Sequence, residues 1–230
     1  MHLFRSRALL FFVVWAISFS TSALARTPDP VSRVQVSLFD DAQVDPGILA
    51  QAQARASEVF AQAGIVLDWL VCPPRDPQDF SPSTSPCSTL SWPDHLSVRI
   101  VPRGRSVAAD IFGQAFVDDS GHGVYSNVYY QNLVLSRDHP GVSDADMLGY
   151  VIAHELGHLL LGSNSHSASG LMQAAWTPHS LSAYARSFLV FTPAQSVLLR
   201  SRLAPSTQTV ASWSALAPHL PSFARRPESS

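Results

Sequence analysis

The chain of 230 residues is 46% hydrophobic and carries a formal charge of −2 at neutral pH. This composition is typical of a folded globular protein and excludes a largely disordered chain. Because it has no excess of basic residues, we expect no nucleic-acid partner.

The first 25 residues are typical of a secretory signal peptide. Arg5 and Arg7 precede an apolar run over residues 8–19, and small residues end the segment at Ala25. Cleavage after Ala25 would leave 13 arginines against 17 acidic residues. The run is shorter than the roughly 20 residues of a membrane span, so an uncleaved anchor is the less favoured alternative. We expect a secreted, periplasmic or cell-envelope protein with no stable membrane insertion after cleavage.

Residues 26–205 are predicted to form one domain, and residues 206–230 a flexible tail rich in Pro and Ser. The two cysteines, Cys72 and Cys87, lie in a Pro/Ser-rich segment. In an exported chain we expect a disulfide between them. The alternatives are a free reactive thiol or a cysteine that blocks a metal ion in a latent form.

The first half of the domain is predicted to contain several strands and one long helix. Apolar residues alternate in a strand over residues 33–39. Asp45 and Pro46 suit the N-cap and first position of a helix, whose apolar spacing continues to Gly64. Similar alternation predicts a strand at residues 96–100, and further strands are expected at residues 65–71, 111–117 and 124–130.

A second helix is predicted over residues 144–161. Ser143 suits its N-cap, and Gly162 follows its last turn. Because apolar residues occupy most of its faces, we expect this helix in the core. Residues 163–179 should be irregular, and a last helix is expected over residues 193–203.

His154 and His158 lie four residues apart on the second helix, which places both imidazoles on one face, one turn apart. This separation allows both rings to bind one Zn²⁺. Glu155 lies beside that face and is expected to act as the general base that activates a zinc-bound water. Three polar groups in an otherwise apolar helix would be costly without such a use. The alternative is a chance grouping of two surface histidines and a solvated glutamate.

A catalytic zinc requires a third protein ligand and one open position. After His158 the chain has no Asp, and its single Glu is Glu228 in the tail. The candidate ligands are therefore histidines, namely His166, His179 and His219. We favour His166, because Gly162 can turn the chain back toward the metal.

The residues around these histidines resemble the motif of the metzincin metalloproteases. The family pattern is H-E-x-x-H-x-x-G-x-x-H or D, followed by a methionine in a tight turn beneath the metal. Here HELGH occupies residues 154–158, and Gly162 follows four residues later instead of three. His166 lies eight residues after the second histidine instead of six, and Asn164 stands at the family's position. An amide is a poor zinc ligand, so His166 stays the expected one.

The resemblance implies further features of the site and fold. Met172 would be the Met-turn residue. The implied fold is α+β of the zincin type: a twisted mixed sheet of four or five strands, a backing helix, a buried active-site helix and a C-terminal helix. The edge strand would bind an extended substrate, and residues 111–130 could supply it. Tyr184 is a candidate for stabilising the transition state, or else part of the pocket wall. Three tyrosines are also considered as pocket walls, although strand aromatics more often pack: Tyr125, Tyr129 and Tyr130.

These features predict a monomeric, secreted zinc metalloendopeptidase that takes Zn²⁺ as cofactor and acts on peptides or proteins. One alternative is another zinc amidohydrolase, acting on cell-wall peptides. A second alternative is a non-catalytic secreted module with a structural zinc, which would need a closed shell of four protein ligands. The cleavage preference cannot be predicted, because it depends on pocket walls formed by distant segments.

Overall fold

The computed structural model describes residues 31–73, 85–104, 107–136, 141–162, 165–176 and 189–204. All of them belong to the second of two units into which the chain divides, Val31–Ser230. The predicted signal peptide and tail lie outside these residues, as do four candidates named above: Asn164, His179, Tyr184 and His219. Within the described residues, no helix has the length and apolar character needed to cross a membrane.

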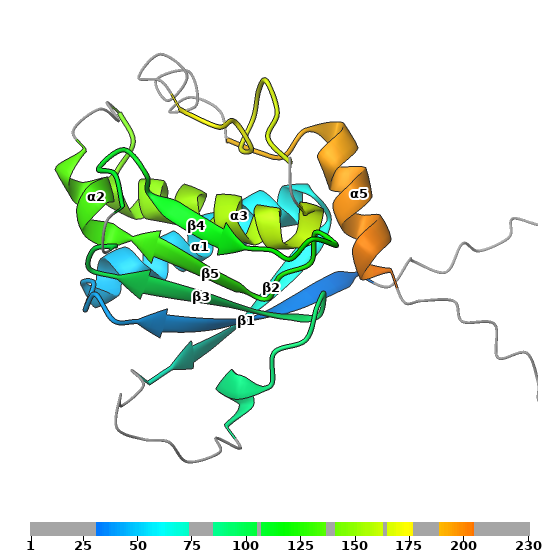
Figure 1. The fold of residues 1–230 in the computed structure, drawn as a ribbon, viewed down its shortest axis with the longest axis horizontal. Helices are drawn as coiled ribbons and strands as arrows, with labels where there is room; N and C mark the ends of the chain where they lie inside the picture. Colours follow the sequence, from blue (N-terminus) through cyan, green and yellow to red (C-terminus); the bar gives the residue numbers. More distant parts are fainter. Residues whose placement is uncertain are drawn as a thin grey trace, which may run out of the picture. The chain divides into compact units, whose positions relative to one another are not determined.

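A five-stranded sheet forms the base of the structure (Figure 1), with strand order β2-β1-β3-β5-β4. Neighbouring strands are parallel except β4, which pairs antiparallel to β5 at one edge. The strands are β1 (Ser32–Asp40), β2 (Ile65–Cys72), β3 (His95–Val101), β4 (Gly113–Phe116) and β5 (Tyr125–Tyr129). The mixed sheet therefore leaves one edge of β4 unpaired within the described part of the chain.

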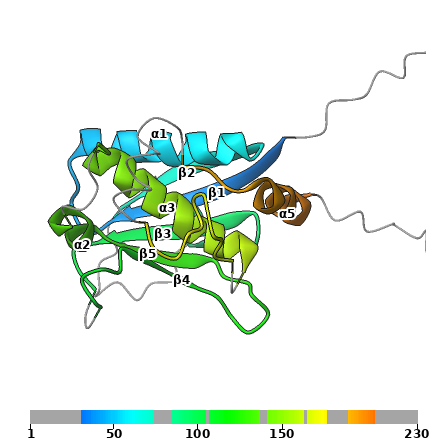
Figure 2. The same ribbon diagram turned by 90° about the horizontal axis from the view of Figure 1, so that it is seen from above.

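Helix α1 (Pro46–Gln62) carries the chain from β1 to its parallel neighbour β2. The carboxylate of Asp45 accepts hydrogen bonds from the amides of Gly47 and Ile48, as expected of an N-cap. Helix α3 (Asp144–Leu161) lies beside α1 on the same face of the sheet (Figure 2). Gly149 permits this contact, because a Cβ there would lie 2.7 Å from the carbonyl oxygen of Ala52.

The core lies between the sheet and these two helices. The inward side chains of β1 and β3 are fully buried there, and they are Val34, Val36, Leu38, Leu96, Val98 and Ile100. Helix α5 (Pro193–Leu203) packs against α3. The expected α+β architecture is thus confirmed, with its mixed sheet, backing helix, buried helix and C-terminal helix.

Two short helices were not predicted. The strand expected at residues 124–130 ends at Tyr129, and α2 (Tyr130–Leu135) follows without a loop. A 3₁₀-helix, η1 (Pro86–Ser88), lies in the segment between β2 and β3. Both are too short to produce a helical hydrophobic period. The predicted disulfide is confirmed, since Cys72 and Cys87 are bonded to each other.

Candidate metal centre

Helix α3 places two histidines and one glutamate at the centre of the structure. The Ser143 hydroxyl accepts a hydrogen bond from the amide of Asp146 and so begins the helix. Nearly all the other residues of the helix are apolar and buried. The imidazoles of His154 and His158 face each other with ring centroids 4.7 Å apart, and their Nε2 atoms are 3.0 Å apart. The spacing of one helical turn therefore directs both rings to one point.

His166 joins these two rings from the segment after α3. The helix ends at Gly162, which has a φ of +84° and donates its amide to the carbonyl of His158. A Cβ at Gly162 would lie 2.9 Å from the carbonyl oxygen of Gly121, so glycine suits both the backbone conformation and the close approach. The His166 ring lies 4.7 Å from that of His158 and 5.6 Å from that of His154.

The three histidines form a group that could hold one metal ion. Their ligand atoms all lie within 4.8 Å of one another, and burial decreases from His154 through His158 to His166. Three imidazole nitrogens are a donor set that suits zinc. The side chains present therefore fit the ion, with room for a further ligand.

Hydrogen bonds at Nδ1 orient two of the rings. His154 donates from Nδ1 to the carbonyl oxygen of Leu171 over 2.9 Å. Because a carbonyl oxygen can only accept, the neutral His154 ring carries its proton on Nδ1 and leaves the Nε2 lone pair for a metal. The Nδ1 of His158 lies 2.8 Å from the hydroxyl of Ser165. Trp176 supports the same arrangement, since its indole N–H donates to the Leu171 carbonyl and its ring meets His154 edge to face.

Burial keeps these imidazoles neutral. It lowers the pKa of His154 to about 4 and that of His158 to about 3, the latter also through the neighbouring imidazoles. A histidine must be neutral to bind a metal. At neutral pH, both rings are therefore ready to bind without a proton to displace.

Glu155 points toward β4 and is 5% exposed. Burial raises the pKa of its carboxyl group to about 8, and the backbone amide of Ala115 opposes this by donating a hydrogen bond to it. Gly113 makes room for the carboxylate, because a Cβ there would lie 2.4 Å from its Oε1 atom. The pKa of this carboxyl group is raised, and the group lies beside three histidines that could hold a metal ion. Such a group is suited to accepting and returning a proton.

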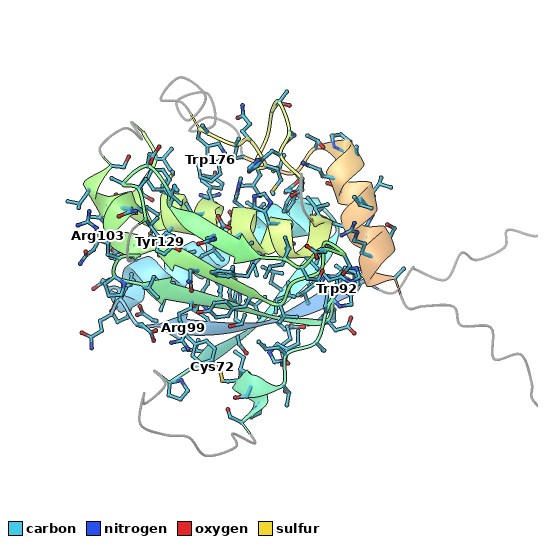
Figure 3. The ribbon with its side chains drawn as sticks, viewed as in Figure 1. Cys72, Trp92, Arg99, Arg103, Tyr129 and Trp176 are labelled. Carbon is cyan, nitrogen blue, oxygen red and sulfur yellow. A yellow bond between two sulfur atoms is a disulfide. The ribbon has the colours of Figure 1, made fainter. Side chains whose placement is uncertain are left out.

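A cleft of about 580 Å³ opens over these groups. One wall comes from β4 and the residues before it, and the other from residues 173–176. Small side chains face it at Gly113, Ala115 and Ala174. Figure 3 shows Trp176 on the segment above α3. An extended chain can therefore lie between the unpaired edge of β4 and the opposite wall, next to Glu155 and the histidines.

Met172 is fully buried against α3. A Cβ at Gly157 would lie 2.7 Å from its sulfur, so the methionine packs on the turn between His154 and His158. The segment that carries it is held by backbone hydrogen bonds between Leu171 and Val190 and between Ser167 and Met172. Met172 thus lies against the turn of α3 that carries the two histidines.

The structure also shows where the prediction of the cleft was incomplete. Tyr125, Tyr129 and Tyr130 do not line it, and the hydroxyl of Tyr129 instead donates to Gln114. The aromatic residues that line the cleft are Phe112 and Trp176, and neither was predicted. A glycine inside a strand can mark a close approach, so Gly113 offered a signal in the sequence. Trp176 and Ser165 offered none.

No protein-family model matches the sequence, and no curated protein shows significant similarity to it. The fold is similar to those of several solved structures. The zinc-dependent peptidase from Methanocorpusculum labreanum aligns at 16% identity with a TM-score of 0.44, over 71% of this chain and 99% of its own. Archaemetzincin from Methanopyrus kandleri aligns at 14% identity with a TM-score of 0.47, over 77% and 99%. Metalloproteinase-II from Bacteroides fragilis aligns at 14% identity with a TM-score of 0.47, over 76% and 54%. At these values, the chemistry has to be judged from the site itself.

Proposed function

We propose that this protein is a zinc-dependent endopeptidase of the metzincin type that acts outside the cytoplasm. The observation that carries the proposal is the buried Glu155 carboxyl group beside three converging imidazoles, in a cleft bordered by a free strand edge. His154, His158 and His166 would hold the ion through their ring nitrogens. Zinc bound there supplies a Lewis acid for the scissile carbonyl and lowers the pKa of a coordinated water.

Glu155 would move the proton in this reaction. Its carboxylate accepts a proton from the attacking water and returns it to the nitrogen of the leaving amine. The buried position of Glu155 would keep its carboxyl group away from bulk solvent, so that the proton is exchanged with the attacking water and the leaving amine. The free edge of β4 would bind the substrate backbone in an extended conformation, which directs the scissile bond over Glu155.

Two features favour catalysis over a structural metal. Among the described residues, the group contains three metal-binding side chains, one fewer than a closed structural shell. A structural site also has no use for a buried acid, which costs free energy wherever it lacks a function. The residues that line the cleft would determine whether proteins or cell-wall peptides are the substrates.

Replacing Glu155 by Gln tests the proposal. We expect casein cleavage to fall about 10²–10⁴-fold while zinc content stays at that of the wild type, because the amide keeps the shape but cannot take up the proton. Glu58→Gln, the same change on the exposed side of α1, should leave cleavage unchanged. The proposal is wrong if the wild-type protein binds zinc but cleaves neither casein nor cell-wall peptides. Cleavage of cell-wall peptides alone would favour the amidohydrolase.

A further inference from the structure

The last turn of α3 is held by side chains from two distant segments. An α-helix leaves its final carbonyl groups without partners inside the helix. Here the carbonyl of His158 accepts the amide of Gly162, as noted above. The next two carbonyls accept side-chain donors: Trp92 Nε1 donates to Leu159 over 2.9 Å, and Arg202 Nη1 donates to Leu160 over 2.6 Å. The turn so held is the one that carries His158.

Trp92 is itself fixed in place on both sides. Its indole ring stacks on the imidazole of His122, with ring centroids 3.8 Å apart and planes inclined by 23°. Ser91 and His95 exchange two backbone hydrogen bonds around it, of 3.0 and 2.7 Å. The indole ring is therefore held by the β4–β5 connection and by the start of β3, in addition to its hydrogen bond to α3.

The segment before Trp92 is anchored to the sheet by a buried histidine. His95 is 5% exposed, and its Nδ1 donates to the carbonyl of Thr89 over 2.9 Å. Because Nδ1 holds the proton, Nε2 accepts the hydroxyl of Ser37 on β1, over 2.8 Å. The Cys72–Cys87 disulfide joins the same segment to the end of β2. These contacts connect the sheet to the segment that carries Trp92, and the indole N–H connects that segment to the last turn of α3; Figure 3 labels Cys72 and Trp92.

We propose that Trp92 and Arg202 are positioning residues for the metal centre, which fix the last turn of α3 and so hold His158 where a metal needs it. This inference rests on the proposed metal site. Losing either donor leaves a carbonyl of that turn without its partner, and the turn can relax toward other donors. Metal ligands tolerate displacements of only about 0.5 Å, so we expect such relaxation to weaken binding. Changes outside the ligand shell typically lower metal affinity about 10–100-fold.

Trp92→Phe removes the indole N–H and keeps an aromatic ring to stack on His122. Trp69→Phe is its matched control, because Trp69 also donates through Nε1, over 2.8 Å to Ser57, between β2 and α1. We expect Trp92→Phe to weaken zinc binding about tenfold, measured by competition with a chromophoric chelator. It should also alter the visible spectrum of the cobalt(II)-substituted protein, which reports ligand geometry. Trp69→Phe should lower the melting temperature and change neither reading.

A second pair keeps the test decisive should Trp92→Phe fail to fold. Arg202→Met removes the donor to Leu160, whereas Arg200→Met removes a donor to Ala63 at the end of α1. We expect weaker zinc binding for Arg202→Met only. Equal zinc affinity within each pair would overturn the inference, even if all four variants lose stability. A wild-type protein that binds no zinc would instead contradict the proposed metal site, so the two failures can be distinguished.

Discussion

The metal centre joins a helix half and a loop half, which are held in place by different kinds of contact. His154, Glu155 and His158 sit on α3, where the helical repeat sets their spacing and a packed core surrounds them. His166 and Met172 belong to a segment without helix or strand, held by hydrogen bonds to residues far along the chain. One such bond runs from the Gln195 side chain to the carbonyl of Ser165. The spacing of the groups in the helix half is thus set by local geometry, whereas the loop half is placed by tertiary contacts alone.

This difference has a consequence for metal binding. The helix half is already arranged, because core packing orders it whether or not an ion is bound. The loop half contributes the most exposed of the three histidines. We therefore expect the free-energy cost of ordering the site on metal binding to come mainly from the loop half.

Replacing His166 with Ala removes the metal-binding side chain of the loop half. We expect a loss of zinc affinity of about 100-fold or more, because a ligand is removed, and such a loss exceeds what changes around the ligands typically cause. The measurement is zinc competition with a chelator. Glu58→Gln, on the exposed side of α1 and far from the group, should leave affinity unchanged. Asn164→Ala should also leave it unchanged, and a loss there with none in His166→Ala would assign the third ligand to Asn164.

The position of Glu155 in the helix half depends on its contact with β4, and Gly113→Ala tests this dependence. A methyl group at residue 113 would lie 2.4 Å from Oε1 and 2.6 Å from Cγ of Glu155, so the carboxylate or β4 has to move. We expect peptidase activity to fall about tenfold, since a misplaced general base loses part of a 10²–10⁴-fold effect. Zinc affinity should not change, because Glu155 is not a ligand.

Gly47→Ala is the control for this change, at an exposed position in the first turn of α1. Its activity per folded molecule should equal that of the wild type. If Gly113→Ala instead loses zinc affinity and activity in parallel, then β4 positions the histidines as well as Glu155. The expectation that β4 affects only Glu155 would then be wrong. Equal activity in the two variants would show that the carboxylate does not depend on the space beside Gly113.

The same division explains what could be predicted from the sequence. The helical repeat places His154, Glu155 and His158 together without any knowledge of the fold, and apolar alternation predicts the strands at residues 33–39 and 96–100. The partners of the loop half could not be predicted in this way. Ser165 and Trp176 act through hydrogen bonds to His158 and to the Leu171 carbonyl, and such pairs follow only from the folded path of the chain. The three tyrosines considered as pocket walls do not line the cleft, which agrees with the expectation that strand aromatics more often pack.

The helix half should also leave a signature in the stability of the metal-free protein. Burial raises the pKa of Glu155 from 4.5 to about 8, so between these values the folded state binds more protons than the unfolded state. Stability from this group is therefore present below pH 4.5 and is lost as the pH rises to 8. The pKa values of His154 and His158 are lowered from 6.5 to about 4 and 3, so their contribution is lost as the pH falls below 6.5. These groups together place the stability maximum near pH 6.5.

Glu155→Gln separates the two sides of this maximum. With a chelator present, we expect the free energy of unfolding of the wild type to fall by up to about 2 kcal/mol between pH 6.5 and 8, since each pH unit of differential protonation is worth about 1.4 kcal/mol. The variant should lack this decline and keep the loss below pH 6.5, which belongs to the histidines. Urea unfolding from pH 5 to 9 measures both sides. Parallel curves for the two proteins would mean that Glu155 is solvated without the metal, and that the helix half is not preformed.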